Sequence, residues 1–252
     1  MWKCRGPRVQ RRPLFAVQNS EKSKNFPGAG WYNGAIRPEE VDAVTKRLLG
    51  ITAGLALLQG LRLGGLWLLV YGPGRGSLAD SLYQAAYMGL ASVLLLAAGR
   101  RTGVAFGLLP RPGHRRELLA GGAAEVFFLV TALLRLPEGG PGLLGLACGA
   151  LLTPLFEELL FRGWVWRGLE GRGEKAAYLG SAALFGLWHL GYVPSILWRT
   201  ALLGRPAAPL EAAVWKVLAG TAFGLLFGAA RYKSGRICPS LLLHMAVNTF
   251  GS

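Results

Sequence analysis

Acidic side chains and cysteines are scarce in this sequence. Only 13 Asp and Glu accompany 28 Lys and Arg, so the formal net charge is +15. Charged residues make up 16% of the chain, whereas a soluble domain has about 25%. This composition excludes a disordered acidic protein and a coiled coil. The three cysteines, Cys4, Cys148 and Cys238, include no CxxC pair, which argues against a disulfide scaffold and a metal cluster.

Apolar residues are abundant instead, at 52% of the chain, and they form long runs. Because a spanning helix needs about 20 mostly apolar residues, the runs predict an all-α, polytopic transmembrane bundle with about seven spans. The stretch 104–110 is too short to span and is interpreted as interfacial. We expect the spans near residues 48–71, 82–98, 118–136, 142–166, 177–198, 212–230 and 237–250.

The positive charge alternates between the predicted loops, which favours a membrane protein over a nucleic-acid-binding protein. Loops after the second, fourth and sixth spans are rich in Arg and Lys, and the intervening loops are poor. This places the N-terminus in the cytoplasm and the C-terminus outside. We therefore expect an integral protein of a bacterial cytoplasmic membrane in contact with membrane lipids, with an organelle membrane as the alternative. No nucleic-acid partner is expected.

Residues 1–47 differ from the rest and are expected to form a basic, disordered tail ahead of a membrane domain at 48–252. They have no sustained apolar period and no apolar core for a signal peptide. A transit peptide or an over-extended gene start are the alternatives. Arg37-Pro38-Glu39-Glu40 is typical of a helix start, because proline suits the first helical position and acids suit the first turn.

The first candidate site residues are Glu157 and Glu158, which lie in the fourth predicted span and are followed by Arg162. Glu158 and Arg162 are four apart, so they can pair on one helix face. Glu157 points about 100° away and stays available for chemistry. A purely structural ion pair at a helix end explains the motif equally well.

Histidines supply the other candidates. His189 lies in the fifth predicted span, and His244 shares a face with Asn248 in the last one. Each alone is better explained by packing or by hydrogen bonding between helices. Estimated at about 1.5 Å of rise per residue, their depths allow them to meet Glu157 in an intramembrane cavity open to the cytoplasmic half.

Together these groups supply what peptide hydrolysis without a covalent intermediate requires. A carboxylate and an imidazole can activate a water, and a second histidine with an amide can donate to an oxyanion. The chain has neither a GxSxG elbow nor an HExxH zinc motif.

The ordered motifs resemble the CPBP intramembrane proteases, also called the CAAX-protease, bacteriocin-processing or Abi family. The resemblance covers about residues 140–252. It is carried by three motifs in order: Glu157-Glu158 with Arg162, Phe185 four residues before His189, and His244 four before Asn248.

The resemblance implies a glutamate-dependent endopeptidase with a conical cavity open to membrane and cytosol. It implies that Glu157 activates the water with His189, that Glu158 and Arg162 support the site, and that His244 and Asn248 stabilise the oxyanion. The substrate is a protein or peptide, cut near its C-terminus or membrane segment.

Two alternatives to this mechanism stay open. No cofactor is expected, but a zinc ion held by Glu157, His189 and His244 is chemically plausible. A non-catalytic adaptor or immunity protein that keeps the fold is the other alternative. Glu125, inside the third span, is expected to pair with Arg62 or Arg135, or else to line the cavity.

Overall fold

The computed structural model describes residues 38–71, 77–111, 113 and 115–251. All regular structure within these ranges is helical, which confirms the all-α class. Residues 1–37, with Cys4 and most of the expected tail, lie outside the described residues. The α-helices are α1 (Pro38–Leu69), α2 (Ser77–Arg101), α3 (Arg115–Leu134), α4 (Gly139–Ala147), α5 (Thr153–Glu158), α6 (Trp166–Leu169), α7 (Glu174–Trp188), α8 (Val193–Leu202), α9 (Pro209–Ser234) and α10 (Ile237–Phe250). Three 3-10 turns are η1 (Leu136–Glu138), η4 (Glu170–Arg172) and η5 (His189–Tyr192). Two π-helices are η2 (Cys148–Leu152) and η3 (Leu159–Val165).

Helix ends follow local sequence signals. α1 begins at Pro38, as the sequence predicted. α9 begins at Pro209 after an extended Ala208, and it ends at Gly235, whose φ of 69° is left-handed. The Gly235 N–H donates to the carbonyl of Arg231, which closes the last turn. Proline at the start and glycine just past the end therefore fix the bounds of this long helix.

Five helical segments in the described part of the chain are long and apolar enough to cross a membrane: Thr45–Leu69, Leu78–Arg101, Arg115–Leu134, Leu136–Arg172 and Pro209–Ser234. α10 is a shorter apolar helix. The run at 177–198 is not one of these segments. It is helical, but the 3-10 turn η5 separates α7, which ends at Trp188, from α8. The bundle thus has fewer uninterrupted spans than the apolar runs predicted.

The two glutamates lie between two π-helical segments. α5 is flanked by η2 and η3, whose turns are wider than α-helical turns. The Thr153 N–H donates to the carbonyl of Cys148 and so closes a π-turn directly before Pro154. Proline has no N–H, and its ring clashes with the carbonyl four residues earlier, so a widened turn here has a local cause. Such bulges often occur at functional sites.

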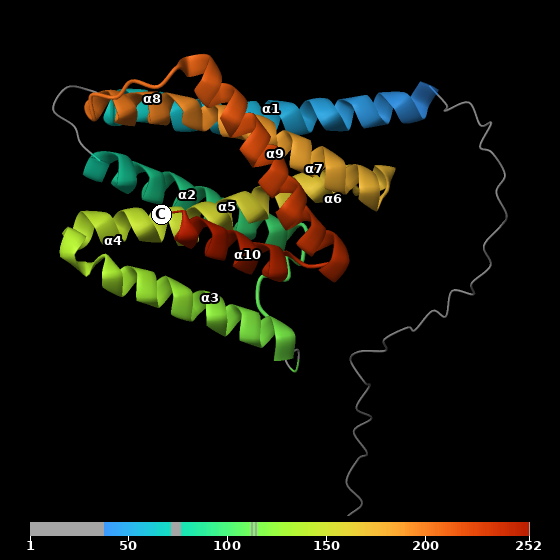
Figure 1. Cartoon of the computed structure of the whole chain (residues 1–252). Helices are drawn as coiled ribbons and strands as arrows, with labels where there is room; N and C mark the ends of the chain where they lie inside the picture. Colours follow the sequence, from blue (N-terminus) through green and yellow to red (C-terminus); the bar gives the residue numbers. More distant parts are fainter. Residues whose placement is uncertain (1–37, 72–76, 112, 114, 252) are drawn as a thin grey trace, which may run out of the picture. The chain divides into compact units, whose positions relative to one another are not determined.

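α5 lies inside the bundle, against α2 on one side and α10 on the other. Figure 1 shows α9 crossing the bundle obliquely, and it packs against α7, α8 and α10. The contact of α7 with α9 depends on buried glycines four residues apart, Gly220, Gly224 and Gly228. A Cβ at Gly224 would lie 2.9 Å from the carbonyl oxygen of Ala182, so the two backbones approach closely there.

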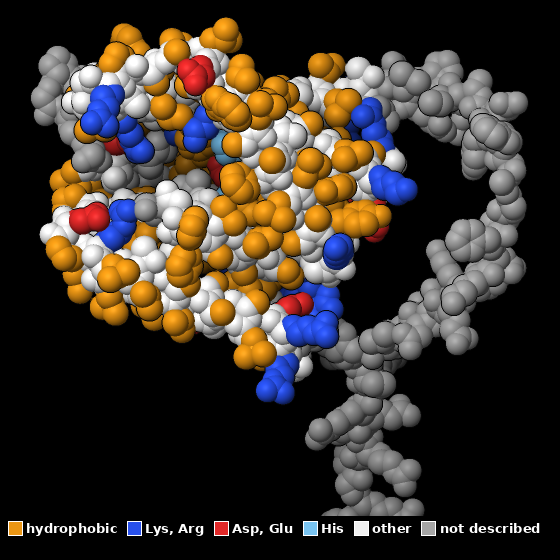
Figure 2. Space-filling model, in the orientation of Figure 1, with side chains coloured by type: hydrophobic (Ala, Val, Ile, Leu, Met, Phe, Trp, Pro, Cys, Tyr) orange, Lys and Arg blue, Asp and Glu red, His pale blue; other side chains and the backbone are white. Residues whose placement is uncertain are grey.

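The outer surface is apolar, as a lipid-facing surface requires. Large hydrophobic side chains are exposed along α1, α2, α3 and α9, including Trp67 and Leu134 at 75% each. α3 has no buried residue in its described part. Figure 2 shows hydrophobic side chains spread over the visible face, with Lys and Arg gathered at its margins. Exposed apolar area of this extent is typical of a membrane-embedded surface.

Candidate active site

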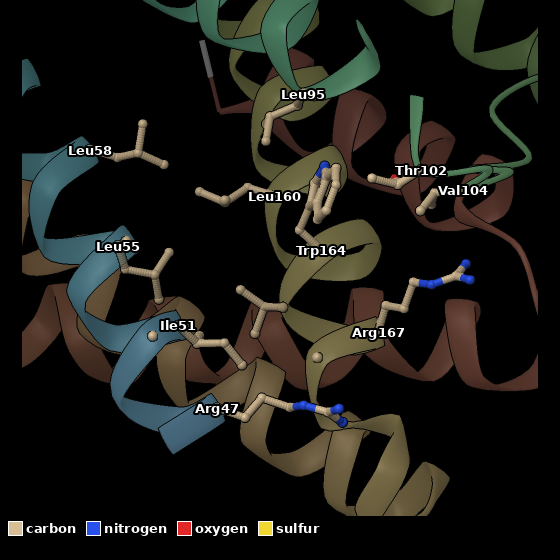
Figure 3. Close-up of a pocket in the computed structure, with 14 residues that line it drawn as sticks. Arg47, Ile51, Leu55, Leu58, Leu95, Thr102, Val104, Leu160, Trp164 and Arg167 are labelled. Atoms are coloured by element: carbon tan, nitrogen blue, oxygen red, sulfur yellow. The ribbon is translucent and has the colours of Figure 1, made fainter. Parts of the chain in front are cut away.

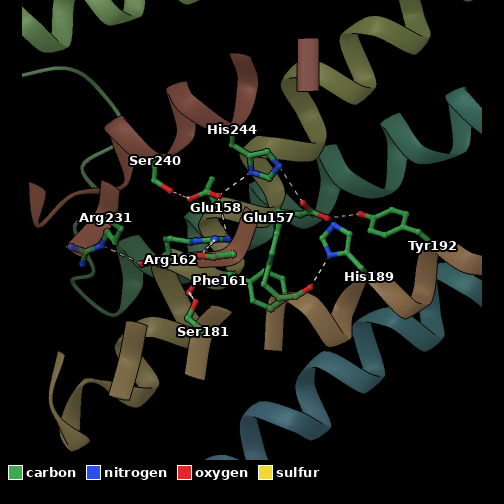
Figure 4. Close-up of polar contacts among 12 residues, drawn as sticks. Glu157, Glu158, Phe161, Arg162, Ser181, His189, Tyr192, Arg231, Ser240 and His244 are labelled. Carbon is green, nitrogen blue, oxygen red and sulfur yellow. Dashed lines mark hydrogen bonds and ion pairs between the residues drawn. The ribbon is translucent and has the colours of Figure 1, made fainter. Parts of the chain in front are cut away.

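Glu157 is buried, and polar side chains from two other elements approach its carboxylate. The hydroxyl of Tyr192 in η5 donates to Oε1 over 2.6 Å. Nε2 of His244 in α10 lies 3.6 Å from Oε2. Figure 4 shows this carboxylate between His244 and Tyr192, with the ring of His189 close by. The structure therefore brings together three of the predicted site residues.

Glu158 is fully buried and is compensated by its neighbours. Arg162 Nη1 lies 3.3 Å from its Oε1, which is the predicted pair along one face. Ser240 donates to Oε2. Arg162 Nη2 donates to the carbonyl of Gly224 over 3.0 Å, and its guanidinium lies 4.4 Å from the centroid of the Phe185 ring. Glu158 and Arg162 thus form a buried ion pair linking η3 to α7, α9 and α10.

His244 bridges the two glutamates. Its Nδ1 lies 3.0 Å from Glu158 Oε1, and its Nε2 faces Glu157. A carboxylate oxygen accepts hydrogen bonds, so Nδ1 carries a proton and donates to Glu158. The ring stacks on Phe227, with centroids 4.2 Å apart. Packing and the Glu158 bond fix the ring's orientation.

His189 is oriented by a main-chain contact. Its Nδ1 is 2.7 Å from the carbonyl oxygen of Phe185, one turn earlier. Because a carbonyl only accepts, Nδ1 carries the proton, and in the neutral ring Nε2 keeps its lone pair. The ring packs edge-on against Phe185 at 4.6 Å. His189 therefore presents an acceptor nitrogen rather than a donor.

The turn that carries His189 is anchored by α1. Gln59 Nε2 donates to the carbonyl of Trp188 over 2.7 Å, and Arg62 Nη1 donates to that of Gly191 over 2.9 Å. In a 3-10 turn, side chains three apart eclipse one another. His189 and Tyr192 accordingly lie on one side, with their rings 5.4 Å apart.

Sequence reasoning missed Tyr192 and Ser240. Ser240 lies four residues before His244, as Asn248 lies four after it, so a polar stripe on α10 was a usable signal. Tyr192 gave no such signal, because its position depends on the 3-10 turn that begins at His189. Asn248 Nδ2 donates to the carbonyl of Gly149 over 2.9 Å, which links α10 to η2.

Glu125 does not pair as expected. Arg62 Nε donates to Gln84, and Arg135 pairs with Glu138 at 3.3 Å. Glu125 is exposed on α3 and lines a groove between α3 and α10, away from the two glutamates. It therefore belongs to neither the ion-pair network nor the candidate active site.

Two cavities lie near the site on opposite sides. One, of about 660 Å³, is lined by Tyr192, Gly149 and Thr153 among others. The other, of about 630 Å³, is a mostly apolar groove between α1, α2 and the η3–α6 segment, with Arg47 and Arg167 at one end (Figure 3). No carboxylate or histidine lines this apolar groove. The polar cavity is thus the one that adjoins groups able to do hydrolytic chemistry.

Among the described residues, no group of three His, Cys, Asp or Glu side chains is arranged to hold a metal ion. The geometry of Glu157, His189 and His244 thus gives the zinc alternative no support. Cys148 and Cys238 are buried free thiols.

Comparison with known proteins finds one family model that matches part of the chain. The family model for Type II CAAX prenyl endopeptidase Rce1-like proteins matches residues 139–250. This range contains both glutamates, Arg162, both site histidines and Asn248. No curated protein and no solved structure matches the chain. Over residues 139–250, the chain is therefore similar to the Rce1-like CAAX proteases.

Proposed function

We propose that this protein is a metal-independent glutamic endopeptidase of the CAAX type. It hydrolyses a peptide bond near the C-terminus of a membrane-associated protein or peptide. The observation that carries the proposal is the buried Glu157 carboxylate, which lies beside His189 and within 3.6 Å of His244. The family match supports the general activity, and the residue roles are proposed from the geometry.

Glu157 and His189 are proposed to hold the attacking water. Both the carboxylate and Nε2 of a neutral His189 are hydrogen-bond acceptors, so one water can donate a hydrogen to each. A lone pair of the water oxygen is then directed at the carbonyl carbon of the substrate. As the oxygen bonds to the carbonyl carbon, Glu157 takes the proton, and it returns that proton to the leaving amine nitrogen when the C–N bond breaks.

The negative charge that develops on the carbonyl oxygen needs donors. His244 and the side-chain amide of Asn248 lie one turn apart on α10 and are proposed to supply them. Because Nδ1 of His244 already donates to Glu158, its part in this role requires the imidazolium form, in which Nε2 also carries a proton. Ser240, Glu158 and Arg162 hold His244 in place and do not touch the reacting atoms. By the alternation of basic loops, the chain is proposed to have its N-terminus in the cytoplasm.

A purified-protein assay tests this function. The full chain in detergent is incubated with a farnesylated CAAX peptide that carries an N-terminal fluorophore, and products are identified by mass spectrometry. We expect cleavage by the native chain and by Glu125→Gln, and none by Glu157→Gln. Glu125 is the matched control, because its change removes a carboxylate from a span without touching the site.

Cleavage by purified Glu157→Gln at the native rate would overturn the proposed mechanism. A native rate that falls after chelation and is restored by zinc would replace it with the metal-dependent version. A folded native chain that cleaves no peptide at all, prenylated or not, would favour the adaptor alternative.

A further inference from the structure

The polar cavity of about 660 Å³ extends from the candidate site toward the ends of α2, α4 and α8. Two of its lining residues connect it to the site: Tyr192, which donates to Glu157, and Gly149, which accepts from Asn248. Figure 2 shows a hollow bordered by Lys and Arg, with acidic and histidine atoms at its inner end. A substrate reaching Glu157 from this side must pass these cations.

The charged lining of this cavity is mainly positive. The lining contains four cations, Arg62, Arg135, Arg199 and Lys216, and a single acid, Glu138. Arg135 pairs with Glu138, and Arg199 forms an ion pair with Asp80, which is buried and does not line the cavity. Within the described part of the chain, no carboxylate lies within ion-pair distance of Arg62 or Lys216. The cavity therefore carries two uncompensated positive charges.

Arg62 is an unusual cation for a membrane span, because it is fully buried. Its hydrogen-bond acceptors, Gln84 and the carbonyl of Gly191, are both neutral. Its Nη2 has no hydrogen-bond partner within the described chain. Burying a charge without a counter-ion is costly, and an ionisable group inside a membrane protein usually marks a functional site. An anion entering this cavity would supply the missing compensation.

Both uncompensated cations flank the candidate catalytic residues. The guanidinium of Arg62 lies 4.1 Å from the centroid of the Tyr192 ring, whose hydroxyl binds Glu157. Lys216 is half-buried on α9, one helical turn before Gly220, which lies directly against the His189 ring. An anionic group in the cavity would thus lie within a few residues of the scissile bond, since an extended chain spans about 3.3 Å per residue.

We propose that this cavity binds the free C-terminal carboxylate of the substrate. Lys216 contacts the carboxylate, and Arg62 adds the buried positive charge behind Tyr192. The inference rests on the proposed peptidase function and extends it. Recognition of a terminal carboxylate restricts hydrolysis to bonds near the end of a chain and excludes internal loops of other membrane proteins. Neither residue lies in the part of the site that performs the hydrolysis.

Binding to an inactive protein tests the subsite separately from catalysis. The Glu157→Gln chain in detergent is titrated against the fluorescent farnesylated CAAX peptide, prepared as the free acid and as the C-terminal amide. Because a hydrogen bond to a charged group is worth about 1.5–3 kcal/mol, the acid should bind at least about tenfold more tightly. Adding Lys216→Gln should reduce this ratio toward one by weakening the acid only.

Lys233→Gln is the matched control, since Lys233 is an exposed cation on the same helix outside the cavity. It should leave the acid-to-amide ratio unchanged. Arg62→Gln is expected to lower the ratio as well. Should that variant unfold, the acid–amide comparison and Lys216→Gln still decide the question.

Equal affinity for acid and amide would overturn the subsite, as would a ratio that survives Lys216→Gln. A different result would assign the cations to a lipid headgroup. In that case the acid and the amide bind equally well, and the native chain binds anionic lipid more tightly than Lys216→Gln does. Strong preference for the acid without cleavage by the native chain would contradict the peptidase function and leave the subsite standing.

Discussion

At the scale of single residues, the two adjacent glutamates have different surroundings. Glu158 is compensated by Arg162, Ser240 and His244, whereas Glu157 faces Tyr192 and the two imidazoles. A helix turns about 100° per residue, so neighbouring side chains point to different partners. This difference in surroundings is why we propose a structural role for Glu158 and a chemical role for Glu157.

The Glu158–Arg162 pair predicts a coupled loss of stability. Arg162→Ala leaves a buried carboxylate without its cation and should lower the free energy of unfolding by about 3–5 kcal/mol. The double change Glu158→Gln with Arg162→Ala should cost less than the sum of the single changes. Unfolding of the detergent-solubilised chain measures both. Native stability of Arg162→Ala would contradict the pair.

Tyr192 provides a milder test. Tyr192→Phe removes the hydroxyl that donates to Glu157 and keeps the ring that lies over Arg62. Because a hydrogen bond to a charged group contributes about 1.5–3 kcal/mol, kcat should fall by roughly tenfold or more without loss of folded protein. An unchanged kcat would show that Tyr192 does not orient the carboxylate during turnover.

Asn248→Ala tests the oxyanion role. Removing one such donor lowers kcat by roughly 10²–10³ in other oxyanion sites, and the same loss is expected here. Because Asn248 also donates to Gly149, the folded fraction must be measured alongside the rate. Near-native turnover in a folded variant would remove Asn248 from this role.

At the scale of secondary-structure elements, a 3-10 turn follows α7, and π-helices lie on either side of α5, which carries the two candidate glutamates. His189 ends α7 and begins η5, and its ring lies against the glycine face of α9. A Cβ added at Gly220 would be 2.8 Å from His189 Cγ and Nδ1. This contact leaves no space for a larger residue at position 220.

Gly220→Ala should therefore displace the His189 ring and lower kcat more than it lowers stability. Gly89→Ala in α2 is the matched control, since nothing lies within 4 Å of a Cβ there. Rates and thermal unfolding of both variants decide the point. Equal rates for the two would mean that the ring position at His189 is not set by this glycine.

The elements also show what the sequence can and cannot predict. The Glu158–Arg162 pair and the face shared by His244 and Asn248 were predictable, because helical spacing alone brings such side chains together. The 3-10 turn at His189–Tyr192 was not predictable, because Gln59 and Arg62, more than 120 positions away, donate to carbonyls at this turn. The apolar run across 177–198 predicted a continuous helix, and Tyr192 was missed with it.

At the scale of the whole molecule, an apolar exterior surrounds a buried polar network. Exposed leucines cover α1, α2 and α3, while Glu157, Glu158, Arg162 and His244 are buried. Ionisable groups in a membrane protein are costly and are found facing a bundle interior or a cavity, which is the arrangement seen here. The fold thus buries these four ionisable side chains inside an apolar bundle.

The central claim is that Glu157 makes this protein a protease, and protein termini in cells test it most directly. Membranes from cells expressing the native chain or Glu157→Gln at matched levels are compared by terminus-resolved mass spectrometry. The account predicts new peptide ends near substrate C-termini that occur only with the native chain. Identical ends in both samples, in a host where the native chain is folded in the membrane, would contradict it.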